Sequence, residues 1–163
     1  HVLKEILNSV KCEVDSFIET LISDKTMDFI EKLKRFMNFI AKIATKMEGP
    51  MISDLMKNHP KLWHEIQEFR SKKANSSLAR LLKQGIKNGV FRKDIHPELI
   101  VLAYVSAVHN IMNPEVLSQL PISANQVFKE LIKILFEGIF TPAGRKKYKT
   151  STLIKENYGE TII

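Results

Sequence analysis

The stretch QGIKNGVFRKDIHPEL, residues 84–99, decides the fold expected for this chain. It ends a long helical pattern with two glycines: Gly85 is expected to permit close packing near the helix end, and Gly89 to stop the helix in the left-handed conformation. Pro97 then opens a second helix, since proline is favoured at a first helical position. The sequence before this stretch predicts a layered helical body, and the sequence after it predicts a pair of apolar helices. We call residues 84–99 the junction.

The composition is that of an ordinary globular domain. The chain has 163 residues, of which 44% are hydrophobic and 26% charged, values typical of one folded unit. Its single cysteine, Cys12, excludes an intrachain disulfide and a cysteine-based zinc site. The net charge of +7 favours anionic partners, although a solvated, lysine-rich surface explains it equally well. No apolar run reaches the ~18 residues that a membrane span requires.

Apolar residues spaced alternately four and three apart predict helices throughout the segment before the junction. The last of these helices is unbroken from Pro60 to about Asn88. Its middle, residues 70–77, is polar and small, which indicates either partial exposure or a bend. The helices predicted before the junction cover residues 3–22, 29–47, 50–57 and 60–88.

Two further helices are predicted after the junction. Residues 97–112 are apolar nearly all the way round, which is typical of a helix buried on every side. Ser123 begins the last helix, with Gln126 at capping-box spacing, and Pro142 is expected to stop it. The sequence therefore predicts an all-α domain over residues 1–142, followed by a basic and mostly irregular tail over residues 143–163.

The last two predicted helices carry more apolar surface than the earlier helices can cover, and monomeric soluble proteins avoid large exposed apolar patches. A second copy of the chain would cover it, with two helices from each copy forming a two-fold, four-helix interface. The alternative is that both helices are simply central in the fold. The residues expected at the dimer interface are Val101, Val105, Val108, Phe128, Leu131, Leu135 and Ile139.

The sequence carries no recognisable catalytic constellation. It has neither a Gly-rich phosphate loop nor a nucleophile elbow, so we expect no enzymatic activity and no cofactor. His64 and Glu68 lie four residues apart on one predicted helix, but a third metal ligand at helical spacing is missing. The basic run 145–149 is not accompanied by a groove-reading helix, which favours a solvated surface over a nucleic-acid contact.

Large, soft or aromatic side chains gather in the second to fifth predicted helical segments. Small-molecule sites are mostly apolar with a few polar groups, and methionine adapts to varied ligand shapes. Arg70, Tyr104 and His109 would supply the polar groups. The alternative is that these residues form an ordinary core. The residues expected to bind ligand are Phe36, Phe39, Ile40, Met47, Met51, Leu55, Trp63, Ile66, Arg70, Tyr104, His109 and Met112.

The junction resembles a segment in the regulatory domain of TetR-family transcriptional repressors. In that family a long helix ends in a Gly-x-x-x-Gly-x-Phe-Arg-x-Asp turn, which GIKNGVFRKD at residues 85–94 matches, and the dimerisation helix follows. The order of the helices over residues 1–142 is similar as well. The motif LFEGI at residues 135–139, near the end of the last predicted helix, strengthens the resemblance.

The resemblance implies a bacterial, cytoplasmic repressor that forms a homodimer. It also implies a small, largely apolar or amphipathic ligand that releases the protein from operator DNA, and no membrane partner. That family begins with a helix-turn-helix domain, which is not visible here, so operator DNA would be contacted only through a domain outside this sequence. The alternatives are a helical carrier of apolar ligands or lipids and a pure interaction module, neither with a DNA-related role.

Overall fold

The computed structural model of the chain describes residues 2–46, 50–111 and 113–157. All regular elements in these ranges are helical, which confirms the predicted all-α class. The elements are α1 (Val2–Ser23), α2 (Phe29–Lys46), α3 (Pro50–Asn58), α4 (Pro60–Lys73), the π-helix η1 (Ala74–Leu78), α5 (Ala79–Lys87), α6 (Pro97–Ile111), α7 (Pro114–Ser118), α8 (Ala124–Ile139) and α9 (Pro142–Asn157).

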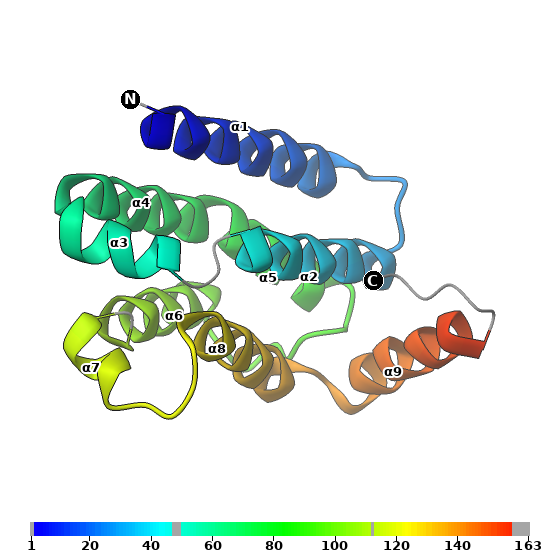
Figure 1. The fold of residues 1–163 in the computed structure, drawn as a ribbon. Coiled ribbons are helices and arrows are strands. Elements are labelled where there is room, and N and C mark those ends of the chain that lie inside the picture. The colour runs from blue at the N-terminus through cyan, green and yellow to red at the C-terminus, as the bar shows by residue number, and fades with distance from the viewer. Residues whose placement is uncertain (1, 47–49, 112, 158–163) are drawn as a thin grey trace.

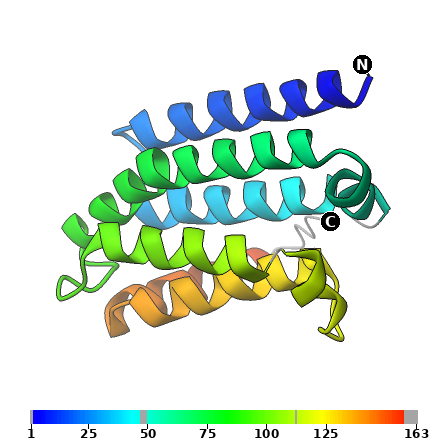
Figure 2. The same cartoon turned by 90° about the vertical axis from the view of Figure 1, so that its left-hand side faces the viewer.

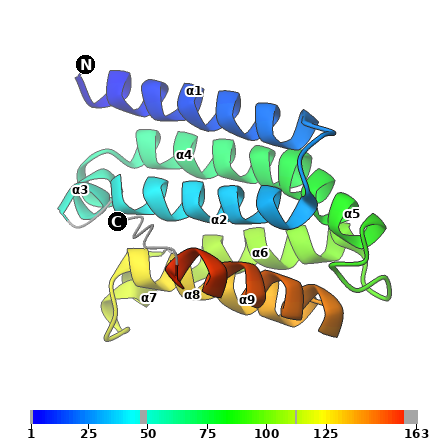
Figure 3. The same cartoon turned by 90° about the vertical axis from the view of Figure 1, so that its right-hand side faces the viewer.

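The helices stack in layers beneath α1 (Figure 1). Helices α2 and α4 run below α1, and α6 and α8 lie side by side at the end of the molecule away from α1 (Figures 1 and 2). Helix α9 lies at the edge of the molecule that faces the viewer in Figure 3. The main hydrophobic core is shared by α1, α2, α5, α6 and α8, so each layer buries one face against the next.

One helical column runs from Pro60 to Lys87, as the sequence predicts, and η1 lies at its centre. The backbone N–H of Ala79 donates to the carbonyl of Ala74, which is the wider hydrogen-bond spacing of a π-helix. The polar segment thus produces a local widening of the helix. It is only partly exposed, because Ser77 and Leu78 are buried.

The two glycines of the junction have the roles that the sequence predicts: Gly89 is the left-handed stop, and Gly85 permits close packing. Gly89 ends α5 with a φ of 70°, in the left-handed region. A Cβ atom on Gly85 would lie 2.1 Å from a ring atom of Phe91, so only glycine lets this ring lie on the helix. The backbone N–H groups of Val90 and Phe91 both donate to the Gly85 carbonyl, at 2.9 and 3.1 Å.

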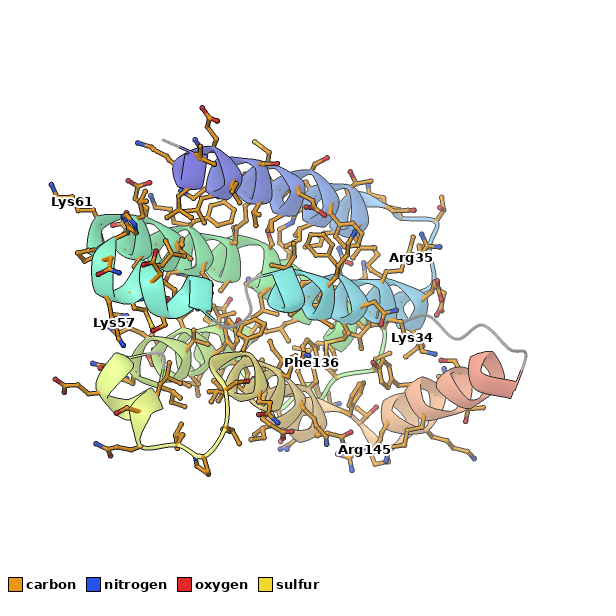
Figure 4. The ribbon with its side chains drawn as sticks, viewed as in Figure 1. Lys34, Arg35, Lys57, Lys61, Phe136 and Arg145 are labelled. Carbon is orange, nitrogen blue, oxygen red and sulfur yellow. The ribbon has the colours of Figure 1, made fainter. Side chains whose placement is uncertain are left out.

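Phe91 is the centre of an aromatic cluster that joins three parts of the chain. Its ring lies edge-on to Phe29 of α2, with centroids 5.5 Å apart. It also lies 5.7 Å from the ring of Phe136 and 5.5 Å from that of Phe140. Figure 4 shows Phe136 directed from α8 toward α2. Because Phe91 is only 1% exposed, this cluster closes the core at the end of α5.

Helix α8 begins at the predicted capping box and ends beside the junction. Ser123 Oγ accepts the N–H of Gln126, and Gln126 Oε1 accepts the N–H of Ser123, both at 3.2 Å. At the other end, the N–H of Arg92 donates to the carbonyl of Ile139 at 2.8 Å. The junction therefore determines where α8 lies in the body.

The C-terminal segment, predicted to be irregular, is helical over Pro142–Asn157. Thr141 caps this helix, because its Oγ1 accepts the N–H of Gly144 at 2.9 Å and Pro142 follows at the first helical position. Gly144 packs on the junction, where a Cβ would lie 2.3 Å from the Val90 carbonyl oxygen. Pro142, which the sequence predicts to stop the last helix, therefore also begins a new one.

A buried lysine ties the loop after α1 to the first residue of the junction. Lys32 is only 4% exposed. Its ammonium group donates to the carbonyls of Ile22 and Asp24, at 3.3 and 2.6 Å, and to Gln84 Oε1 at 3.1 Å. Burial lowers the pKa of Lys32, and the charge of Asp24 partly offsets that effect. Three oxygen partners thus compensate this cation.

We predict opposite stability effects for Gly89→Ala and Gly138→Ala. Neither glycine has an atom within 4 Å of the added Cβ, so sterics do not separate the two. Gly89→Ala should lower the free energy of unfolding by about 1 kcal/mol, because alanine resists positive φ. Gly138 lies within α8, where alanine should raise it by about 0.5–1 kcal/mol. Urea unfolding monitored by circular dichroism measures both, and equal signs would contradict the prediction.

Candidate functional site

Most side chains predicted to bind ligand lie in two adjacent apolar clusters inside the body. Trp63 of α4 packs against both clusters and so connects them. Side chains of α2, α3, α4 and α6 therefore form one continuous apolar region. From the predicted set, the main cluster includes Phe36, Phe39, Ile40 and Tyr104, and the smaller cluster includes Leu55 and Ile66.

One described member of the predicted set, His109, does not join this region. His109 is exposed on α6 and does not contribute a polar group to the interior. Met47, the side chain of Met51 and Met112 lie outside the described residues. The polar groups that remain from the prediction are therefore those of Arg70 and Tyr104.

The residues predicted for a dimer interface face the interior of this chain. Val101, Val108 and Ile139 are at most 3% exposed, so a second copy cannot reach them in this arrangement. The others are partly buried and pack against the main cluster; they are Val105, Phe128, Leu131 and Leu135. The apolar residues that α6 and α8 expose are Leu99, Leu102 and Ile134, with 60%, 60% and 67% of their surface accessible.

Arg70, Tyr104 and Phe128 meet in the interior from three different helices, and we call them the interior node. The Arg70 guanidinium carbon lies 5.5 Å from the centroid of the Phe128 ring. The Phe128 and Tyr104 rings lie edge to face, with centroids 6.5 Å apart. Arg70 belongs to α4, Tyr104 to α6 and Phe128 to α8. The node therefore depends on the packing of all three helices.

Arg70 is half-buried, and this burial lowers the pKa of its guanidinium. One hydrogen bond is present, from Nη1 to Gln67 Oε1 at 3.3 Å. Within the described residues, no carboxylate pairs with Arg70. A guanidinium has five N–H donors, so most of its donors have no partner there.

The carboxylates on α4 and the one on α1 that faces it lie against other side chains and not against Arg70. The pairs in question are Lys11 with Glu65 at 3.6 Å, Lys73 with Asp15 at 2.5 Å, and His64 with Glu68 at 3.5 Å.

Burial changes the pKa of both polar members of the node. It raises the pKa of Tyr104 to about 12, and the charge of Arg70 offsets only part of that rise. It lowers the pKa of Arg70, and Tyr104 offsets part of that change. At neutral pH the node therefore consists of a charged guanidinium and a protonated phenol. Both are hydrogen-bond donors, and the phenol makes no hydrogen bond to another described residue.

Neither Phe128 nor Gln67 is among the residues that the sequence predicts to bind ligand. Phe128 was assigned to the dimer interface, and Gln67 was not singled out. Gln67 lies three residues before Arg70, a spacing that places both side chains on one helix face, so the sequence did contain a signal for it. The inward orientation of Phe128 has no comparable signal, because α8 is apolar on more than one face.

Other chemistry is sparse in the described part of the chain. It contains no group of three or more His, Cys, Asp and Glu residues that could hold a metal ion. The pair His64 and Glu68 stands on the surface of α4 without a third ligand. None of the described helices is both long enough and apolar enough to cross a bilayer.

We predict that Arg70→Met stabilises the ligand-free protein. Removing a half-buried cation that lacks a carboxylate relieves its desolvation cost, which we expect to exceed the ~2 kcal/mol of a favourable cation–π contact. The free energy of unfolding should rise by about 1 kcal/mol or more, equivalent to about 2–4 °C in Tm.

The matched control is Arg80→Met, because Arg80 is exposed and pairs with Glu19 at the surface. Its effect should stay within about 0.5 kcal/mol. Thermal and urea unfolding compare both variants with the wild type. A loss of stability in Arg70→Met, larger than that in Arg80→Met, would show that the guanidinium is well compensated.

No protein-family model matches the sequence, and no solved structure matches it significantly. It is similar to a curated protein of Bacillus subtilis (strain 168), the uncharacterized HTH-type transcriptional regulator YvaF. The two are 18% identical over 137 residues, which cover 84% of this chain and 71% of that protein. This distant similarity indicates a relationship to regulators of transcription.

Proposed function

We propose that the chain is the effector-binding and dimerisation domain of a TetR-like bacterial transcriptional repressor. The observation that carries the proposal is the similarity to an HTH-type transcriptional regulator, which extends over 84% of the chain. The all-α architecture and the glycine-bounded junction support it. In this role the chain binds a ligand in the cytoplasm and does not convert it.

The proposed ligand region is the apolar interior around Trp63, bounded by the interior node. Binding would act as a population shift between two arrangements of the helices. The ligand must bind the arrangement that is incompetent for DNA more tightly, by ~1–3 kcal/mol of coupling free energy for a moderate switch. Helix α6 is suited to transmit this preference, because Tyr104 lies on its inner face and Leu102 on its outer face.

The proposed dimer interface uses the outer faces of α6 and α8. Both helices bury their inner faces in the body, so Leu99, Leu102 and Ile134 point away from it. Exposed Ala103 and Ser106 follow on the same face of α6, and small residues let a partner helix approach closely. A second copy would cover these side chains in an isologous contact.

We predict that the wild-type chain sediments as a dimer and that Leu102→Arg or Ile134→Arg converts it into a monomer. A charge at the centre of an apolar contact lacks a partner there and must be desolvated. The control is Ile6→Arg, which changes a 47% exposed apolar residue on α1. Sedimentation velocity at a fixed protein concentration measures all four proteins. A monomeric wild type, or equal dissociation of the Ile6 variant, would contradict this interface.

The DNA-related role is tested with the parent protein. We expect the codons before His1 to encode a helix-turn-helix domain, and the parent to bind DNA flanking its own gene. Addition of decanoate or decan-1-ol, as apolar probes, should weaken that binding about 5- to 150-fold in a fluorescence anisotropy titration. Binding of these probes without any effect on DNA would instead favour the carrier alternative.

A further inference from the structure

We propose that the interior node binds the acidic head group of an amphipathic ligand, with an organic monocarboxylate as its chemical class. The inference rests on the proposed ligand-binding function and adds the charge of the ligand to it. Arg70 and Tyr104 would hold the carboxylate, and the apolar body of the ligand would lie along α4 toward Trp63.

The first argument is the contrast between the cations of Lys32 and Arg70. The Lys32 ammonium has three oxygen partners at 2.6–3.3 Å, which is how proteins compensate a buried charge. The Arg70 guanidinium has one amide oxygen at 3.3 Å and an aromatic face. The Lys32 ammonium therefore has the oxygen partners that it needs. The Arg70 guanidinium has further N–H groups that can donate to an acceptor from outside the described residues.

The second argument is that the missing acceptor should be anionic. Arginine matches carboxylates in a planar, two-pronged geometry, and charge-assisted hydrogen bonds are about twice as strong as neutral ones. The carboxylates beside α4 are engaged by Lys11, Lys73 and His64. A carboxylate on the ligand would supply the compensation that these side chains do not.

The third argument concerns Tyr104, whose phenol has no hydrogen-bond partner among the described residues. With its pKa raised to about 12, it keeps its proton at physiological pH. It therefore offers an O–H donor and carries no charge that would repel an anion. Arg70 and Tyr104 approach from α4 and α6, so a small head group between these helices could accept from both.

The fourth argument gives the direction of the apolar body. Trp63, Ile66 and Arg70 are spaced by three and four residues, so they share one face of α4. Trp63 packs against both apolar clusters, and Ile66 lies in the smaller cluster with Leu55. A ligand anchored at Arg70 would therefore extend through side chains that are apolar over two helical turns.

The test compares three probes that share a ten-carbon chain and differ only in the head group: decanoate, decan-1-ol and decyltrimethylammonium. Trp63 is the single tryptophan of the chain, so its fluorescence reports binding next to the proposed site. We expect decanoate to bind at least about tenfold more tightly than decan-1-ol, and the cation to bind most weakly.

Variants assign the preference to the node. Arg70→Met should weaken decanoate binding by about tenfold or more and leave decan-1-ol binding within about threefold, because only the charged contact is lost. Tyr104→Phe should weaken decanoate binding by less than Arg70→Met does. Arg80→Met, at an exposed position, should bind all three probes as the wild type does. Circular dichroism of each variant verifies that the helices remain folded.

The outcomes separate this inference from the proposed function. Equal affinity of the wild type for the acid and the alcohol would overturn the acidic head group and leave the ligand-binding function standing. A preference for the acid that survives Arg70→Met would also overturn the inference, because the anion would then bind elsewhere. If none of the three probes binds, the inference fails, and the proposed function is then decided by sedimentation and by DNA binding of the parent.

Discussion

The contact between the Phe91 ring and the bare backbone of Gly85 is the constraint on which the rest of the structure depends. A side chain at position 85 would occupy the space of that ring. With the ring in place, the chain reverses at Gly89 and Val90 comes close to the start of α9. The absence of a side chain at Gly85 thus allows the end of α5 and the start of α9 to meet at the junction.

The cations of Lys32 and Arg70 illustrate how stability and binding differ in their demands. Lys32 is surrounded by carbonyl and amide oxygens, which hold the loop after α1 against Gln84. Arg70 lies at a point where three helices converge, with an aromatic ring on one side and few acceptors. The Arg70 guanidinium is half-buried and makes one hydrogen bond to a described residue, so it keeps N–H groups that a ligand could use.

Helix α6 contributes both to the proposed ligand site and to the proposed dimer interface. Its inner face carries Tyr104 and Val108 into the core, and its outer face presents Leu102 to the surroundings. In the proposed function, a ligand that moves the inner face also moves the outer one, because a helix is displaced as a rigid unit. Helix α8 packs against α6 and carries Phe128, so a ligand at the interior node would also move the second helix of the proposed interface.

The sequence by itself determined the long helices before residue 140, the capping box of α8 and the left-handed stop at Gly89, because these depend on spacing, propensity and backbone freedom within a few residues. It did not reveal α9, because a proline that stops one helix can also be the first residue of the next. The close packing of Gly144 on Val90 accompanies the new helix, and the sequence does not show that contact. Tertiary structure alone decided which faces of α6 and α8 turn inward. A helix that is apolar all round has no intrinsic direction, so its neighbours select the buried face, and the same convergence of helices left Arg70 without a carboxylate.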